Sequence, residues 1–170
     1  MSFDPSESAK EIFDIIKSKT KDDNKLIKLV TSKTKEERIQ IRSVYKSLFN
    51  SDLIEDLKSN YHFNFKEVLI GLFYSPVEYD CYHIRKAVKG LGTDEDALIE
   101  ILATREPERI KEMKEKYKEM FPNRDMVEDI KNDTSGNFWE ILNALLNNER
   151  GNNTQPDFAQ CEKWADQLFL

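Results

Sequence analysis

Residues 26–49 read LIKLVTSKTKEERIQIRSVYKSLF, and residues 98–121 read LIEILATREPERIKEMKEKYKEMF. The two stretches align without a gap at an offset of 72 residues. Further along, DLIEDLK at 52–58 matches DMVEDIK at 125–131, with one additional residue before the second of these. Self-similarity at a period of about 70 residues is typical of two copies of one supersecondary unit. We therefore expect a repeat protein.

Apolar residues recur at helical spacing within each copy. One face of the first copy comprises Phe65, Val68, Leu69, Leu72 and Phe73, and the second copy repeats it as Phe138, Ile141, Leu142, Leu145 and Leu146. No segment shows the alternation of apolar and polar residues that is typical of a strand. The pattern predicts an all-α fold with five helices per copy. The expected helices span 8–18, 22–32, 35–49, 52–59 and 63–74, and then 77–89, 94–104, 107–121, 125–132 and 136–147.

Three threonines are predicted to begin helices. Each resembles the start of a capping box, in which the hydroxyl group and an acid three residues later satisfy the first amide groups of the helix. The pairs are Thr20 with Asp23, Thr34 with Glu37, and Thr93 with Asp96.

The two copies divide the chain into five segments. We expect an N-terminal arm over 1–7, a first repeat over 8–75 and a second repeat over 76–147. A polar linker that contains several asparagines follows over 148–156. The stretch 157–170 would be the first helix of a third repeat that is cut short.

The charge balance argues against a simple electrostatic partner. The 170 residues carry 26 basic and 32 acidic side chains, a net charge of −6, so the chain has no general attraction to nucleic acid or to an anionic bilayer. The polar N-terminus does not resemble a signal peptide, and no apolar run approaches the ~20 residues of a membrane-spanning helix. Two widely separated cysteines, Cys81 and Cys161, fit a reducing compartment. We expect a cytoplasmic protein that does not bind nucleic acid.

One loop of the second copy is predicted to bind a cation. It reads VKGLGTDED over 88–96, and its glycines lack the Cβ atom that shields the main chain. The carbonyl oxygens of Val88, Gly90 and Gly92 can therefore point outward together, as part of the about six to eight oxygens that calcium requires. Asp133, in the predicted loop between the fourth and fifth helices of the copy, would add a carboxylate.

The first copy serves as a control for this hypothesis. Its corresponding loop reads IKSKTKD over 16–22 and contains no glycine, and Asn60 stands where the second copy has an acid. The two elements of the shell are absent together, which indicates that they serve one ion. A turn of this kind is otherwise often only a well-capped connection between helices, and that interpretation stays open. We predict a calcium site in the second copy, with a weaker one at the Thr93 carbonyl and Glu95, and no tight site in the first.

Two stretches of the second copy carry a family resemblance. Residues 84–105, IRKAVKGLGTDEDALIEILATR, and 129–138, DIKNDTSGNF, closely resemble the repeat signature of the annexins. The resemblance is weaker in the first copy, whose divergence is similar to that of protist annexins such as the giardins. It implies five-helix repeats, normally four of them, in a right-handed superhelical arrangement.

The resemblance also implies a function. Annexins bind acidic phospholipids such as phosphatidylserine through calcium, so calcium is the expected cofactor and an acidic membrane surface the expected partner. Carried over by position, the three carbonyls and Asp133 would hold the ion, and Lys89 and Thr93 would contact the lipid headgroup. The protein would lie on membranes peripherally when calcium is present.

Three charged or titratable positions resemble those beside the central hydrophilic channel of annexins. Asp80 and Arg105 match charges that pair there, and His83 stands where an acid is common. The substitution at His83 weakens any inference of ion conduction. We expect a buried structural ion pair between Asp80 and Arg105.

Two other classes of function are considered. Neither His62 nor His83 has a neighbouring serine or cysteine in a recognisable catalytic motif, and no phosphate-binding loop is present, so we predict that the chain is not an enzyme. A calcium-independent helical scaffold that binds cytoskeletal or other protein partners is the alternative. Apolar surface left by an unfinished third repeat would also favour self-association.

Overall fold

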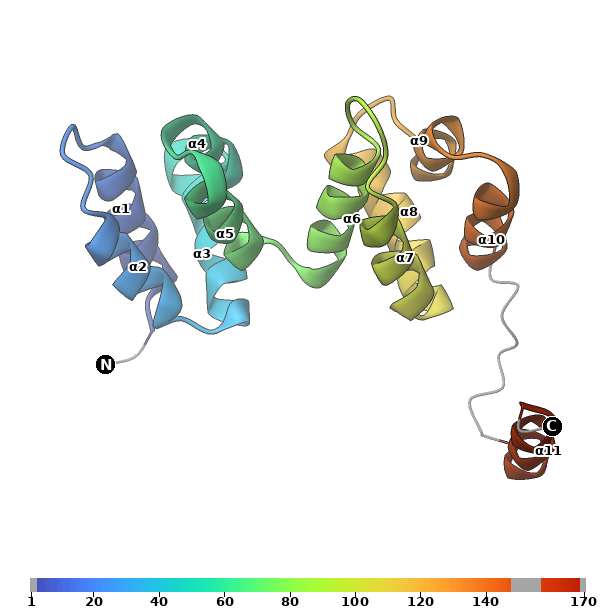
Figure 1. Ribbon diagram of the computed structural model, residues 1–170. Coiled ribbons are helices and arrows are strands. Elements are labelled where there is room, and N and C mark those ends of the chain that lie inside the picture. The colour runs from blue at the N-terminus through green and yellow to red at the C-terminus, as the bar shows by residue number, and fades with distance from the viewer. Residues whose placement is uncertain (1–2, 148–156, 169–170) are drawn as a thin grey trace. The chain divides into compact units, whose positions relative to one another are not determined.

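The computed structural model describes residues 3–147 and 157–168, and every regular element in these ranges is an α-helix (Figure 1). The prediction of an all-α fold is confirmed, and the predicted helices differ from the observed ones only near their ends. The predicted linker over 148–156 lies outside the described residues. The first five helices are α1 (Pro5–Lys17), α2 (Asp23–Thr31), α3 (Lys35–Phe49), α4 (Leu53–Asn60) and α5 (Phe63–Phe73). The next are α6 (Pro76–Ala87), α7 (Glu95–Thr104), α8 (Pro107–Met120), α9 (Met126–Asp133), α10 (Gly136–Leu146) and α11 (Phe158–Leu168).

Helix α1 begins earlier than predicted. Asp4 caps it, because its carboxylate accepts a hydrogen bond of 2.8 Å from the amide of Ser6. Pro5 then suits the first helical position, where a missing N–H costs no hydrogen bond. Part of the predicted N-terminal arm is therefore helical.

Of the three predicted capping threonines, only Thr34 caps a helix. It forms the expected capping box with Glu37 at the start of α3. At α2 and α7 the predictions for Thr20 and Thr93 are wrong, because Asp22 and Asp94 are the caps. Each of these aspartates directly precedes its helix, and its negative charge also suits the positive end of the helix dipole.

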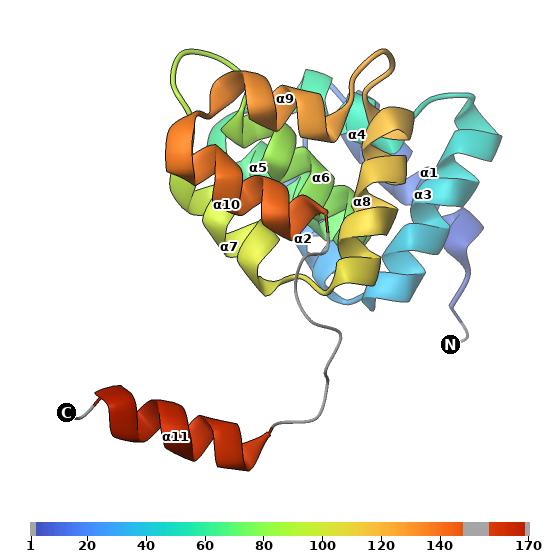
Figure 2. The same ribbon diagram turned by 90° about the vertical axis from the view of Figure 1, so that its right-hand side faces the viewer.

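Each five-helix repeat buries an apolar core of its own. Helix α1 packs against α3 in the first repeat, and α10 packs against α7 and α9 in the second (Figure 2). The tyrosines Tyr45 and Tyr117 occupy equivalent buried positions. Each donates a hydrogen bond of 2.7 Å to an aspartate, Tyr45 to Asp56 and Tyr117 to Asp129. Burial and the neighbouring carboxylate raise the pKa of both tyrosines well above the usual value. The two copies seen in the sequence thus share one internal architecture.

The chain divides into two compact units between His83 and Ile84, inside α6. The start of α6 is held by the first unit, because Glu78 pairs with Arg42 at 2.9 Å and Tyr82 donates to Glu67 at 3.0 Å. The boundary between residues 75 and 76, which rests on sequence similarity, stays a prediction.

Among the described helices, none is long and apolar enough to cross a membrane. Helix α11 contains no buried residue. Its large apolar side chains Phe158, Trp164 and Leu168 are all exposed.

Candidate functional site

The loop between α6 and α7 turns at two glycines, where a residue with a side chain would strain the backbone. Gly90 has a φ angle of +127° and Gly92 one of +86°. A Cβ atom added at either position would meet nothing within 4 Å, so the backbone conformation, and not a lack of space, requires glycine here. A hydrogen bond of 2.9 Å from the Asp94 amide to the Ala87 carbonyl closes the base of the loop.

Asp133 is the last residue of α9, not part of the following loop as predicted. The Thr93 hydroxyl lies 2.8 Å from the Asp133 carbonyl oxygen and 2.6 Å from its carboxylate Oδ2, and its single proton can serve either acceptor. Within the described residues, the other carboxylate oxygen, Oδ1, accepts no hydrogen bond. Two segments 40 residues apart in the sequence therefore meet in the second unit. This contact also gives Thr93 a partner outside α7, where Asp94 provides the cap.

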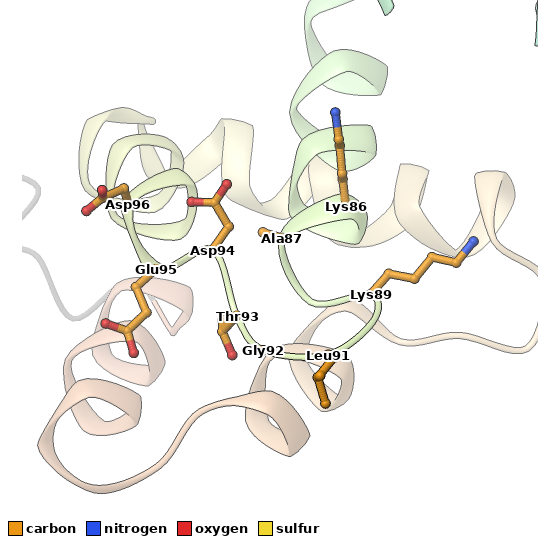
Figure 3. Close-up of a pocket in the computed structure, with 9 residues that line it drawn as sticks. All are labelled: Lys86, Ala87, Lys89, Leu91, Gly92, Thr93, Asp94, Glu95 and Asp96. Atoms are coloured by element: carbon orange, nitrogen blue, oxygen red, sulfur yellow. The ribbon is translucent and has the colours of Figure 1, made fainter. Parts of the chain in front are cut away.

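A pocket beside the loop contains several of the predicted residues. Lys89, Gly92, Thr93 and Glu95 are in its lining, whereas Val88, Gly90 and Asp133 are not. The side chain of Lys89 extends away from Asp94 and Glu95 (Figure 3). The complete lining is Lys86, Ala87, Lys89, Leu91, Gly92, Thr93, Asp94, Glu95 and Asp96.

The predicted ligands differ in how exposed they are. The side chain of Val88 is buried and anchors the loop on α6, where its amide donates to the Ile84 carbonyl. Gly90, Gly92 and Glu95 are exposed. In the described part of the chain, no three His, Cys, Asp or Glu side chains gather as a metal cluster. A cation at this loop would therefore depend on main-chain carbonyl oxygens in addition to the Asp133 carboxylate.

The three channel-like positions are distributed over both units. Asp80 is buried in the part of α6 that belongs to the first unit, and Arg105 follows α7 in the second. The imidazole of His83 lies 4.4 Å from the ring centre of Tyr79 and 5.5 Å from that of Tyr82. The ion pair between Asp80 and Arg105 stays a prediction.

Leu91 is a candidate that the sequence reasoning missed. Its side chain is fully exposed in the loop, between the two glycines. An apolar side chain in so short a turn has no neighbours in the turn to cover it, and that was the signal in the sequence. Single exposed apolar residues are common on protein surfaces, so Leu91 is a candidate because of its place in the loop, between two predicted ligands.

Comparisons with known proteins match both repeats. The family model described as Annexin matches residues 7–72 and 79–145. Annexin A13 of Canis lupus familiaris is 40% identical over 159 residues, which cover 92% of this chain and 50% of that protein. The solved structure of annexin III has a TM-score of 0.85 at 30% identity, covering 99% of this chain and 52% of that chain. Calcium-bound annexin (Sm)1 has a TM-score of 0.71 at 30% identity, covering 89% of this chain and 46% of that chain.

The chain spans about half the length of these proteins. The two ranges that the family model matches include the α6–α7 loop and the end of α9. Both repeats of this chain are matched by the family model. The chain belongs to the annexin family.

Proposed function

We propose that this chain binds acidic phospholipid membranes in a calcium-dependent way, through the α6–α7 loop and the end of α9. The observation that carries the proposal is the contact between Thr93 and Asp133, which joins the glycine loop to a carboxylate. Calcium takes about six to eight oxygen ligands, including carboxylates, main-chain carbonyls and water. The carbonyls of Val88, Gly90 and Gly92 and the carboxylate of Asp133 would supply part of that shell.

The remaining ligand positions would be filled by water or by a lipid phosphate. A chain with a net charge of −6 is repelled by an anionic bilayer as a whole. A bound divalent ion reverses the charge locally and can bridge two negative partners. The exposed ammonium group of Lys89 would add a contact to the headgroup, with Thr93 beside it.

Leu91 would add an apolar contact to the same surface. Burying a leucine side chain is favourable by about 1.5–3 kcal/mol when it is complete. The position of Leu91 between Gly90 and Gly92 would bring it to the lipid together with the ion.

A weaker ion position would use the Thr93 carbonyl and the carboxylate of Glu95. Glu95 is exposed at the first position of α7, within the pocket lining. The proposed role is binding without catalysis, for a cytoplasmic protein that lies peripherally on membranes when calcium is present. That annexin (Sm)1 is described as calcium-bound supports calcium as the ion.

Asp133→Ala tests the ligand assignment. We expect calcium binding, measured by calorimetry, to weaken on the order of a hundredfold, because the only side-chain carboxylate of the main shell is lost. The fold should persist, since the main-chain carbonyl at position 133 still accepts the Thr93 hydrogen bond. Glu128→Ala is the matched control, because Glu128 is an exposed carboxylate on the same helix.

The second arm measures pelleting with phosphatidylserine vesicles. The wild-type chain should pellet with calcium and not with EDTA, and Asp133→Ala should fail in both. Unchanged calcium affinity in the variant would refute the ligand assignment. Pelleting that persists in EDTA would instead favour the alternative, a calcium-independent scaffold.

A further inference from the structure

The first unit joins the equivalent loop and helix end with a charged side chain. The Lys21 ammonium group donates a hydrogen bond of 2.7 Å to the main-chain carbonyl of Asn60. Lys21 aligns with Thr93 at the offset of 72, and Asn60 aligns with Asp133 at the offset of 73 that applies there. Asn60 ends α4 as Asp133 ends α9. The acceptor carbonyl is thus retained in both units, whereas the donor changes from a hydroxyl to a cation.

The surroundings of Lys21 suit a permanent positive charge. Its ammonium nitrogen lies 5.3 Å from the ring centre of Tyr61, a distance at which a cation is attracted by the aromatic face. The Tyr61 ring is buried and therefore fixed in place. The equivalent residue in the second unit is Thr134, whose hydroxyl donates to the Ile130 carbonyl and which offers no ring.

The first loop also uses one of its own carbonyl groups internally. The Ser18 hydroxyl donates a hydrogen bond of 3.1 Å to the Thr20 carbonyl and accepts one of 3.2 Å from the Thr20 amide. Thr20 aligns with Gly92, whose carbonyl is a proposed calcium ligand in the second unit. The corresponding oxygen in the first unit therefore already accepts a hydrogen bond from a neighbour in the loop.

We propose that the Lys21 ammonium group serves as a permanent structural cation in the first unit. Its ammonium group holds the loop after α1 against the end of α4 and makes this contact independent of calcium. Lys21 thereby determines that the first unit does not respond to the divalent ion proposed for the second.

Hydrogen exchange of the whole chain, measured by mass spectrometry in calcium and in EDTA, tests this inference. In the wild type, exchange over 18–22 and 60–62 should be the same in both conditions. Lys21→Met should accelerate exchange there about fivefold in both conditions, because a charge-assisted hydrogen bond is lost at an exposed site. Lys21→Arg keeps the positive charge and should stay close to the wild type.

Lys19→Met is the matched control, since Lys19 is exposed in the same loop and forms no ion pair within the described residues. It should leave the exchange unchanged. Three results would overturn the inference: wild-type exchange over 18–22 that responds to calcium, no acceleration in Lys21→Met, or an equal acceleration in Lys21→Arg. Exchange over 88–94 reports separately on the second unit, so a failure of the proposed calcium site is recognised by its own signal.

Discussion

The two units carry the same tyrosine–aspartate bond in their cores, but each neutralises the aspartate differently. Asp56 of the first unit pairs with Lys17 at 2.7 Å, and that lysine side chain is 44% exposed. Asp129 of the second unit contacts Arg85 and Arg124, both at 3.2 Å, and the Arg85 side chain is only 17% exposed. The contacts of Lys21 and Thr93 also differ, since the donor is an ammonium group in the first unit and a hydroxyl group in the second. Duplication has retained the main-chain and tyrosine positions, while the charged partners around them have diverged.

The largest expected effect comes from removing the two core aspartates. Asp129→Ala should lower the free energy of unfolding by about 3 kcal/mol, because it removes the carboxylate that both Arg85 and Tyr117 contact in a largely buried site. Asp56→Ala should cost less, about 1–2 kcal/mol, since Lys17 can turn to solvent. Urea unfolding followed by circular dichroism measures both. Equal losses of unfolding free energy would contradict the explanation that the aspartate of the second unit contributes more because its cation is more buried.

Gly92→Ala tests the difference between the two loops at an intermediate magnitude. Alanine at a φ angle of +86° should cost about 1–2 kcal/mol in thermal unfolding and should also weaken calcium binding, since the loop must abandon its conformation. The equivalent change in the first unit, Thr20→Gly, relieves no such strain and should cost only about 0.5 kcal/mol through the unfolded state. Unchanged thermal stability and calcium affinity in Gly92→Ala would show that neither property requires the positive φ angle at Gly92.

The helices of both units could be predicted from the sequence because their signals are local. Apolar residues at helical spacing, repeated after about 70 residues, predict which segments are helical. The predicted apolar faces are only partly buried, because Val68 and Ile141 are exposed. The capping residues were harder to predict, because Thr20 and Thr93 each compete with an aspartate that lies next to the helix. The sequence pattern does not indicate whether the threonine or the aspartate is the cap.

The candidate site was only partly predictable for a different physical reason. The glycine loop and Asp133 could be singled out from residue types, and their proximity was a hypothesis until the Thr93 contact was seen. The contact between Lys21 and Asn60 was missed, because a surface lysine carries no periodic signal and its long side chain can reach many partners. The Asn60 carbonyl becomes the partner of Lys21 only because of where α4 lies in the folded unit.

Leu91→Ser tests whether an apolar side chain gives the loop of the second unit a membrane contact that the loop of the first unit lacks. We expect binding to phosphatidylserine vesicles in calcium to weaken about tenfold, because partial burial of one leucine is lost. Calcium affinity without vesicles should not change. Lys19 stands at the equivalent position of the first unit, and Lys19→Ser should have a smaller effect. A loss of calcium affinity in Leu91→Ser would show that the side chain supports the loop instead of contacting lipid.

The smallest expected effect concerns acid stability and compares one aspartate from each unit. Burial alone would raise the pKa of Asp56, but hydrogen bonds from Lys17, Tyr45 and Ser51 outweigh it and hold the pKa below its usual value. Burial likewise opposes the lowered pKa of Asp125, which Lys118 and two main-chain amides stabilise in its charged form.

A carboxyl group with a lowered pKa in the folded state stabilises the protein above its unfolded pKa, and this contribution is lost as the pH falls through the folded value. The urea midpoint should therefore decline from about pH 4 downward, near the unperturbed pKa of aspartate. Asp56→Asn and Asp125→Asn should each lower the midpoint at neutral pH and make the acid decline shallower. An acid decline as steep as that of the wild type in Asp56→Asn would mean that the Lys17 pair does not stabilise the charged carboxylate. Because the Lys17 side chain is 44% exposed, added salt should reduce this contribution.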